Sequence, residues 1–140
     1  MGARTNVRTV RIEWGDCDPM GIVYFPRYFA ILDDCTWHLF EQVVGMSKLR
    51  MREVYKIGGF PLVDARARFL IPSRYGDDVV IESRIAEFRR SSFDVVHRLT
   101  RAGELSVEGF ETRVWSGADP ADPSRLKSFP IPPDVEARFA

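Results

Sequence analysis

The sequence lacks the features that mark membrane, secreted and nucleic-acid-binding proteins. No run of about 18 apolar residues occurs in its 140 residues, which excludes a membrane-spanning helix. Lys plus Arg is 20 and Asp plus Glu is 20, so the zero net charge gives no general attraction to nucleic acid or anionic membrane. The cysteines are Cys17 and Cys35, with no CxxC motif, and the N-terminal segment has no apolar signal core. We therefore expect a cytoplasmic protein with free thiols.

Several catalytic and metal-binding motifs are also missing. The chain has no GxSxG, GxGxxG or GxxxxGK, which excludes a serine-elbow hydrolase and the common phosphate loops. Asp16 and Asp18 imitate the start of a calcium loop, but the twelfth position, which needs a bidentate Glu, is Arg27. His38 and His97 stand alone, without a second ligand at metal-binding spacing, and we expect both to be surface or half-buried. No metal site is predicted.

The periodicities that are present predict one α+β domain over residues 1–140. With 45% hydrophobic residues in 16.1 kDa, the chain can bury a single core. Apolar residues at helical spacing predict a long helix from about Pro26 to the stop at Gly45, and Ser47 can cap a short second helix. Alternating residues predict strands at 7–14, 63–69, 79–85, 93–99 and 105–115, the last bulged at Gly109, followed by a polar loop at 117–124 and a short helix at 132–139.

This order of elements predicts a two-layer fold. One long helix can cover only one face of a five-stranded sheet, and the sheet must curl around the helix to bury its apolar stripe. An open sheet leaves edge strands that favour pairing, so we expect a homo-oligomer.

The loop between the first strand and the long helix carries the most informative chemistry. Asp18 lies in a turn flanked by Gly15 and Gly21, just before the helix begins. A helix N-terminus stabilises negative charge and offers unpaired N–H groups, so a carboxylate and an oxyanion site could meet there, which is one minimal arrangement for acyl transfer. The alternative is that Asp16 and Asp18 simply cap the turn and the helix.

A second cluster lies where the strand pattern breaks. Arg89, Arg90, Ser91 and Ser92 place two guanidinium groups beside two hydroxyl groups, which is suited to binding phosphates. The alternative is an ordinary solvated hairpin, and the same alternative applies to the basic Lys127 near the C-terminus.

The residues Glu13-Trp14-Gly15-Asp16-Cys17-Asp18-Pro19-Met20-Gly21-Ile22-Val23-Tyr24-Phe25-Pro26-Arg27-Tyr28 resemble the signature of the 4-hydroxybenzoyl-CoA thioesterase family. The resemblance extends through Tyr75-Gly76-Asp77-Asp78 and Arg89-Arg90-Ser91-Ser92-Phe93 and covers roughly residues 7 to 133. It implies the hotdog fold, in which a curved five-stranded antiparallel sheet wraps around one long helix. It also implies a dimer with one continuous sheet, often paired into a homotetramer, that hydrolyses an acyl-CoA thioester without a metal or other cofactor.

The same resemblance assigns roles to individual residues. It implies that Asp18 is the catalytic carboxylate and that the backbone N–H of Phe25 polarises the acyl carbonyl. It implies that Arg89, Arg90, Ser91 and Lys127 bind the CoA phosphates, and that these residues can act on the substrate of a neighbouring subunit. We expect Tyr24 and Phe60 to line the acyl pocket.

The leading hypothesis is therefore a thioesterase for a small, aromatic acyl-CoA, with Asp18 as nucleophile or general base. Tol-Pal-type relatives carry a histidine where this chain has Phe25 or Pro26, which disfavours a short-chain acyl-CoA thioesterase. Two hypotheses without thioester hydrolysis stay open: a hotdog protein that binds CoA or acyl-CoA without catalysis, and a hydratase.

Overall fold

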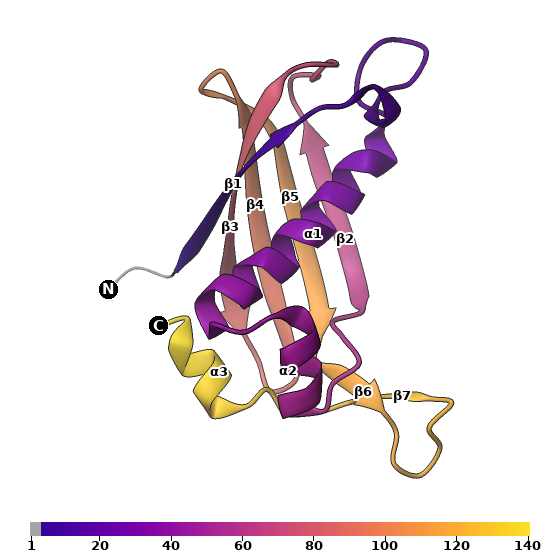
Figure 1. Cartoon of the computed structure of the whole chain (residues 1–140), viewed down its shortest axis with the longest axis vertical. Helices are drawn as coiled ribbons and strands as arrows, with labels where there is room; N and C mark the ends of the chain where they lie inside the picture. Colours follow the sequence, from indigo (N-terminus) through magenta and orange to yellow (C-terminus); the bar gives the residue numbers. More distant parts are fainter. Residues whose placement is uncertain (1–3) are drawn as a thin grey trace.

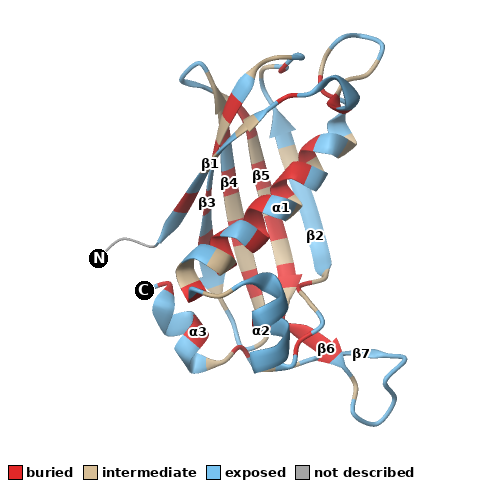
Figure 2. Cartoon of the chain, viewed as in Figure 1, coloured by how far each residue is buried: buried red, intermediate tan, exposed pale blue. Residues whose placement is uncertain are grey.

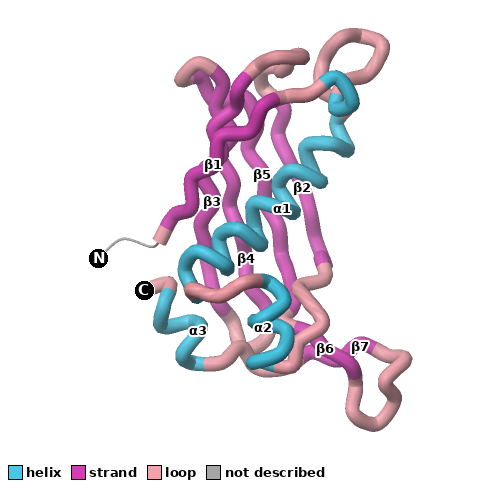
Figure 3. The backbone as a smooth tube through the Cα atoms, in the orientation of Figure 1, coloured by secondary structure: helices cyan, strands magenta, loops and turns pink. Residues whose placement is uncertain are grey.

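The computed structural model describes residues 4–140, so the first three residues of the predicted domain lie outside the described part. Figure 1 shows one curved sheet with a long helix lying diagonally across its concave face. The strands are β1 (Thr5–Arg11), β2 (Leu62–Phe69), β3 (Asp78–Phe88), β4 (Ser92–Arg101) and β5 (Glu104–Val114), all antiparallel in the order β1-β3-β4-β5-β2. The helices are α1 (Phe25–Val44), α2 (Lys48–Tyr55) and α3 (Pro133–Arg138), and a small hairpin joins β6 (Ser116–Ala118) to β7 (Leu126–Ser128). These bounds confirm the predicted α+β class (Figure 3).

The helix termini follow the local signals in the sequence. Helix α1 ends at Gly45, whose φ of 80° is the left-handed conformation that glycine adopts without steric cost. The Ser47 side chain accepts a hydrogen bond from the Arg50 N–H at 3.1 Å and caps α2, as predicted. The start of α1 is different, because its N-cap, Tyr24, makes no side-chain capping bond and the first turn holds no acidic residue.

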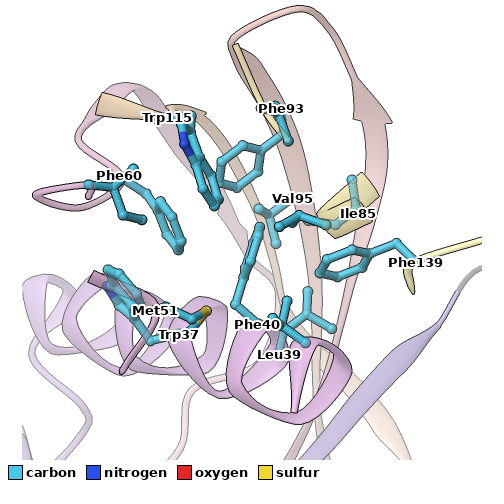
Figure 4. Close-up of a cluster of buried hydrophobic side chains, with 14 residues drawn as sticks. Trp37, Leu39, Phe40, Met51, Phe60, Ile85, Phe93, Val95, Trp115 and Phe139 are labelled. Atoms are coloured by element: carbon cyan, nitrogen blue, oxygen red, sulfur yellow. The ribbon is translucent and has the colours of Figure 1, made fainter. Parts of the chain in front are cut away.

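The core fills the space between α1 and the sheet (Figure 2). One cluster of buried residues lies around the first half of α1 and includes Tyr28, Leu32 and Cys35. A larger cluster is aromatic and lies beneath the second half of α1, with Phe40 at its centre (Figure 4). Its other members come from all over the chain: Trp37, Leu39, Val44, Met51, Ile57, Phe60, Ile85, Phe93, Val95, Trp115, Ile131, Val135 and Phe139.

The structure corrects three details of the predicted elements. The bulge in β5 is not at Gly109; the register shifts where Leu99 pairs with Val107 and Thr100 pairs with Leu105. Gly109 instead allows α1 to approach, because a Cβ at this position would lie 2.4 Å from Leu32 Cδ1. The chain beyond Arg11 leaves β1 for a short 3-10 turn (Trp14–Asp16). The first two residues of the polar loop predicted at 117–124 belong to β6, and the rest of that loop connects β6 to β7. None of the helices within residues 4–140 combines the length and the apolar character that spanning a bilayer requires.

Candidate active site

Asp18 lies at the tip of a small backbone hairpin that ends where α1 begins. The Tyr24 N–H donates to the Asp16 carbonyl at 2.8 Å, and the Asp18 N–H donates to the Ile22 carbonyl at 3.0 Å. The Gly21 N–H closes the turn on the Asp18 carbonyl at 2.9 Å, and Gly21 has the φ of 79° that this turn requires. The Asp18 carboxylate accepts a hydrogen bond from the Met20 N–H at 2.8 Å through Oδ1. This Asp18 hairpin, residues 16–24, therefore fixes its carboxylate relative to the first turn of α1.

Asp18 is one of the residues that line a cavity, which we call the Asp18 cavity. Its volume is about 310 Å³, and the aromatic rings of Trp14 and Tyr75 meet edge-to-face at its wall, with centroids 5.5 Å apart. Trp14 is 77% exposed, which leaves its ring open to a ligand. The other lining residues are Cys17, Pro19 and Gly21.

The backbone N–H of Phe25 directly follows the end of the same hairpin at Tyr24. Phe25 is the first residue of α1, so its N–H has no acceptor one turn earlier within the helix. Its ring lines an apolar groove of about 300 Å³, the Phe25 groove, together with Tyr28, Phe69 and Leu70. Asp18 and Phe25 thus line two neighbouring hollows, separated by the segment 21–23 that contributes to both.

The β3–β4 turn and β7, which carry the predicted phosphate-binding residues, lie at the opposite end of the molecule from the loop between β1 and α1 (Figure 1). The carbonyl of Ser91 accepts from the Trp115 N–H and that of Arg90 from the Ile131 N–H, both at 2.8 Å. This ties the β3–β4 hairpin to the chain that flanks β6 and β7, where Lys127 is exposed. The structure therefore brings Arg90, Ser91 and Lys127 to one end.

Arg89 is engaged differently from its neighbours. Its guanidinium donates to Asp94 at 2.6 and 3.0 Å, to Glu87 at 3.0 Å and to Ser92 Oγ at 2.9 Å. The hydrogen bonds from Arg89 are the main cause that lowers the pKa of Asp94. Arg89 therefore stabilises its own hairpin, whereas no ion pair is formed by Arg90 or Lys127 within residues 4–140.

Tyr24 and Phe60, the two residues predicted to line an acyl pocket, are far apart within one chain. Tyr24 is half exposed beside Phe25 at the start of α1. Phe60 is buried and stacks on Trp37, with ring centroids 4.1 Å apart. Trp37 lies about 18 Å further along α1 than Phe25. Phe60 also borders a cavity of about 440 Å³, the far-end cavity, lined among others by Asp33, Trp37, Lys48, Pro61, Leu62 and Arg113.

A buried ionic network, which the sequence patterns did not predict, runs under α1 between these two ends. Glu111, 5% exposed, receives hydrogen bonds from the Arg113 guanidinium at 3.0 Å and lies 3.2 Å from His97 Nε2. His97 is completely buried, which corrects the expectation of a surface or half-buried histidine, and its Nδ1 lies 2.7 Å from Ser83 Oγ. Arg113 also donates to Asp33 at 2.6 Å and to the Phe60 carbonyl at 2.8 Å. The sequence feature that could have indicated this network is the charged pair Glu111 and Arg113, which occupies inward-facing positions of β5.

This network makes the stability depend on pH. Burial alone raises the pKa of Glu111, but hydrogen bonds and charges from His97 and Arg113 outweigh it and lower the pKa from 4.5 to about 2. A lowered pKa in the folded state gives stability that is complete above about pH 4.5 and is lost as the pH falls towards 2. We expect the urea midpoint of the wild type to fall more steeply between pH 5 and about 2.5 than that of Glu111→Gln.

The matched control is Glu53→Gln, which removes an exposed carboxylate and should leave the acid dependence unchanged. An identical acid dependence in the wild type and Glu111→Gln would contradict the assignment.

Among residues 4–140, no group of three or more His, Cys, Asp and Glu side chains is arranged to hold a metal ion. Cys17 and Cys35 are both free thiols, and Cys35 is buried in the core as the helical stripe predicted.

Comparison with known proteins adds a family to this geometry. The model of the thioesterase-like superfamily matches residues 12–139. The chain is 36% identical over 138 residues to the 4-hydroxybenzoyl-CoA thioesterase of Pseudomonas sp. strain CBS-3, covering 94% of this chain and 95% of the relative. The solved structure of 4-hydroxybenzoyl-CoA thioesterase from that strain superposes with a TM-score of 0.88 at 34% identity, covering 97% of this chain and 99% of the other.

Two further solved structures are informative. A 4-hydroxybenzoyl-CoA thioesterase with one aspartate replaced by asparagine, in complex with 4-hydroxybenzoyl-CoA, superposes with a TM-score of 0.89 at 33% identity, covering 99% of this chain and 100% of the other. A gentisyl-coenzyme A thioesterase superposes with a TM-score of 0.80 at 30% identity, covering 96% and 100%. The predicted hotdog fold is confirmed by these neighbours.

Proposed function

The chain belongs to the thioesterase-like superfamily and is an acyl-CoA thioesterase, and we propose that it hydrolyses a small aromatic acyl-CoA at Asp18. The observation that carries the proposal is the position of Asp18, which lines a cavity from a hairpin joined directly to the uncapped start of α1. The relatives that are named for aromatic acyl-CoA substrates support the choice of acyl group.

The reaction follows from these groups. Either Asp18 attacks the thioester carbonyl, giving a mixed anhydride that water then hydrolyses, or Asp18 takes a proton from the water that attacks. In both routes the C–S bond breaks, the CoA thiolate leaves and takes up a proton, and the acyl group becomes the free acid. The Phe25 N–H donates to the carbonyl oxygen as it becomes negative. No metal or other cofactor takes part in this proposal.

We also propose that the enzyme is a dimer, or a dimer of such dimers, with β2 at the two-fold interface. Strand β2 pairs only with β5 in the described chain and forms one edge of the sheet. Leu62, Val63 and Phe69 along it are large apolar residues that are about half exposed or more. Antiparallel pairing of β2 with β2 of a second copy would continue the sheet and cover these side chains.

Such a pairing would complete the site. Because the two β2 strands run in opposite directions, the Asp18 end of one copy meets the far end of the other. The far-end cavity with Phe60 would then face the Phe25 groove and Tyr24, and Arg90 and Lys127 of the second copy would approach the Asp18 end. This supports a site in which the acyl ring lies between two copies and the CoA phosphates bind to the second copy.

The test of the acyl preference is a panel of thioesters. We expect benzoyl-CoA and phenylacetyl-CoA to be hydrolysed with a kcat/KM at least about 10-fold above that of acetyl-, butyryl- and octanoyl-CoA, because aromatic side chains border both halves of the proposed pocket. Free thiol is measured with a thiol-reactive dye. A preference for the straight-chain esters would contradict the aromatic assignment and favour a short-chain or fatty acyl-CoA thioesterase.

A further inference from the structure

Arg27 has an unusual position for a cation. It is the third residue of α1, at the helix end where the backbone dipole repels positive charge. Its side chain is 48% exposed, yet its guanidinium is directed at one partner rather than at solvent: Nε and Nη2 both contact Asp16 Oδ1, at 3.0 and 2.9 Å. Among the described residues, no acidic side chain in the first turn of α1 offsets this charge, so Asp16 does so from outside the helix.

Asp16 uses its other polar groups to hold the neighbouring backbone. It is 7% exposed, and its Oδ2 accepts the Glu13 N–H at 2.9 Å. Its carbonyl accepts the Tyr24 N–H at 2.8 Å, and the Arg27 N–H in turn donates to the Tyr24 carbonyl at 2.8 Å. Asp16 therefore connects three parts of the chain. These are Glu13 before the Asp18 hairpin, Tyr24 at the end of the hairpin, and Arg27 in the first turn of α1.

This arrangement determines where two reacting groups lie. Asp18 follows Asp16 by two residues, and Phe25 follows Tyr24 by one. The hydrogen-bonded pair Asp16–Tyr24 therefore determines the positions of both Asp18 and Phe25. The Cys17–Val23 bridge continues the pairing towards the tip. A shift of Asp16 relative to α1 would displace the Asp18 carboxylate from the Phe25 N–H while leaving the aromatic core intact.

We propose that Arg27 is a positioning residue, whose guanidinium acts through Asp16 to hold the Asp18 hairpin against the start of α1. The inference rests on the proposed function above. Arg27 itself touches no reacting atom in this proposal, and its effect is to keep carboxylate and N–H at a working distance.

The variant that tests this is Arg27→Ala. We expect kcat for benzoyl-CoA to fall about 10- to 100-fold with KM changed by less than about 3-fold, because a misplacement near 1 Å can cost about 10² in rate. Methylguanidinium added to Arg27→Ala should restore part of kcat, since it can occupy the vacated place beside Asp16. In Asp16→Asn, the further change Arg27→Ala should have little additional effect, because the two act as one unit.

Two measurements separate positioning from folding. Arg50→Ala removes an exposed arginine that also pairs with a carboxylate, Glu53, at 3.3 Å, and it should keep the wild-type kcat. In Arg27→Ala, hydrogen exchange at the Tyr24 amide should accelerate at least about 10-fold, whereas the Val95 amide in β4 should keep its protection. This readout does not require turnover.

An unchanged Tyr24 exchange rate together with a wild-type kcat in Arg27→Ala would overturn the inference. So would a loss of kcat that tracks a general loss of protection at Val95 and is not recovered by methylguanidinium. A wild-type protein that releases no thiol would instead overturn the proposed function, and the exchange measurement would still decide whether Arg27 holds the hairpin.

Discussion

Asp18→Asn should fold like the wild type and lose turnover by about 10³-fold or more. Asp18 is half-buried at the tip of its hairpin, where Asn can still accept the Met20 N–H through its side-chain oxygen, so the loop should persist. Asn is neither a nucleophile of comparable strength nor a base, so both proposed routes lose their central group. Thiol release from benzoyl-CoA measures the loss, and circular dichroism and the urea midpoint establish that the fold is intact.

Asp34→Asn is the matched control for Asp18→Asn. Asp34 is an exposed carboxylate on α1 that lines none of the three hollows described above, so its loss should leave kcat within about 2-fold of the wild type. Benzoyl-CoA should still bind to Asp18→Asn, as measured by calorimetry, in the way that an Asp→Asn variant of the relative binds its acyl-CoA. Wild-type turnover in Asp18→Asn would end the proposed chemistry while leaving the fold assignment untouched.

Arg113→Met should be the most destabilising of the substitutions considered, by about 3–5 kcal/mol. Arg113 is 3% exposed and contacts both oxygens of Glu111, so its loss leaves a carboxylate in the core with only neutral donors and His97 beside it. The Phe60 carbonyl loses its donor at the same time. Urea unfolding followed by tryptophan fluorescence, at one fixed protein concentration, measures the change.

Two comparisons establish the cause of that loss. Arg50→Met removes the arginine of an exposed ion pair and should cost less than about 1 kcal/mol. The double variant Arg113→Met/Glu111→Gln removes the stranded charge and should recover a measurable part of the lost stability. A cost for Arg113→Met as small as that for Arg50→Met would contradict the view that a buried charge network supports the sheet beneath α1.

Features that depend on local patterns could be predicted from the sequence. The apolar stripe of α1, its end at Gly45 and the Ser47 cap are each determined by residues within a few positions of one another. The placement of Asp18 just before a helix N-terminus was predictable for the same reason, since the loop and the helix start are contiguous.

Features that depend on contacts between distant residues were not predictable from patterns. The strand pattern predicts a bulge at Gly109, whereas glycine is needed there because Leu32, 77 positions earlier in the chain, approaches too closely for a Cβ. Arg89 was grouped with Arg90 by adjacency, whereas pairing across the hairpin gives it Asp94 as a partner. His97 was judged as an isolated residue, and only the register of β4 on β5 and β3 places it beside Glu111 and Ser83.

The separation of Tyr24 from Phe60 has a different origin. Both were assigned to one pocket, and within a single chain about 18 Å of helix keeps their surroundings apart. Sequence patterns describe a single copy, whereas the proposed pocket is formed by two copies that pair along the exposed apolar edge of β2.

The most direct test of thioester hydrolysis by this chain is the balance of products from benzoyl-CoA. Free CoA thiol and benzoate should both appear in continuous turnover, in equal amounts, with the wild-type protein and not with Asp18→Asn. Saturable binding of benzoyl-CoA to the wild type with no thiol released would contradict thioester hydrolysis and identify a binding protein. Consumption of an acyl-CoA without thiol release would contradict it as well and point to a hydratase.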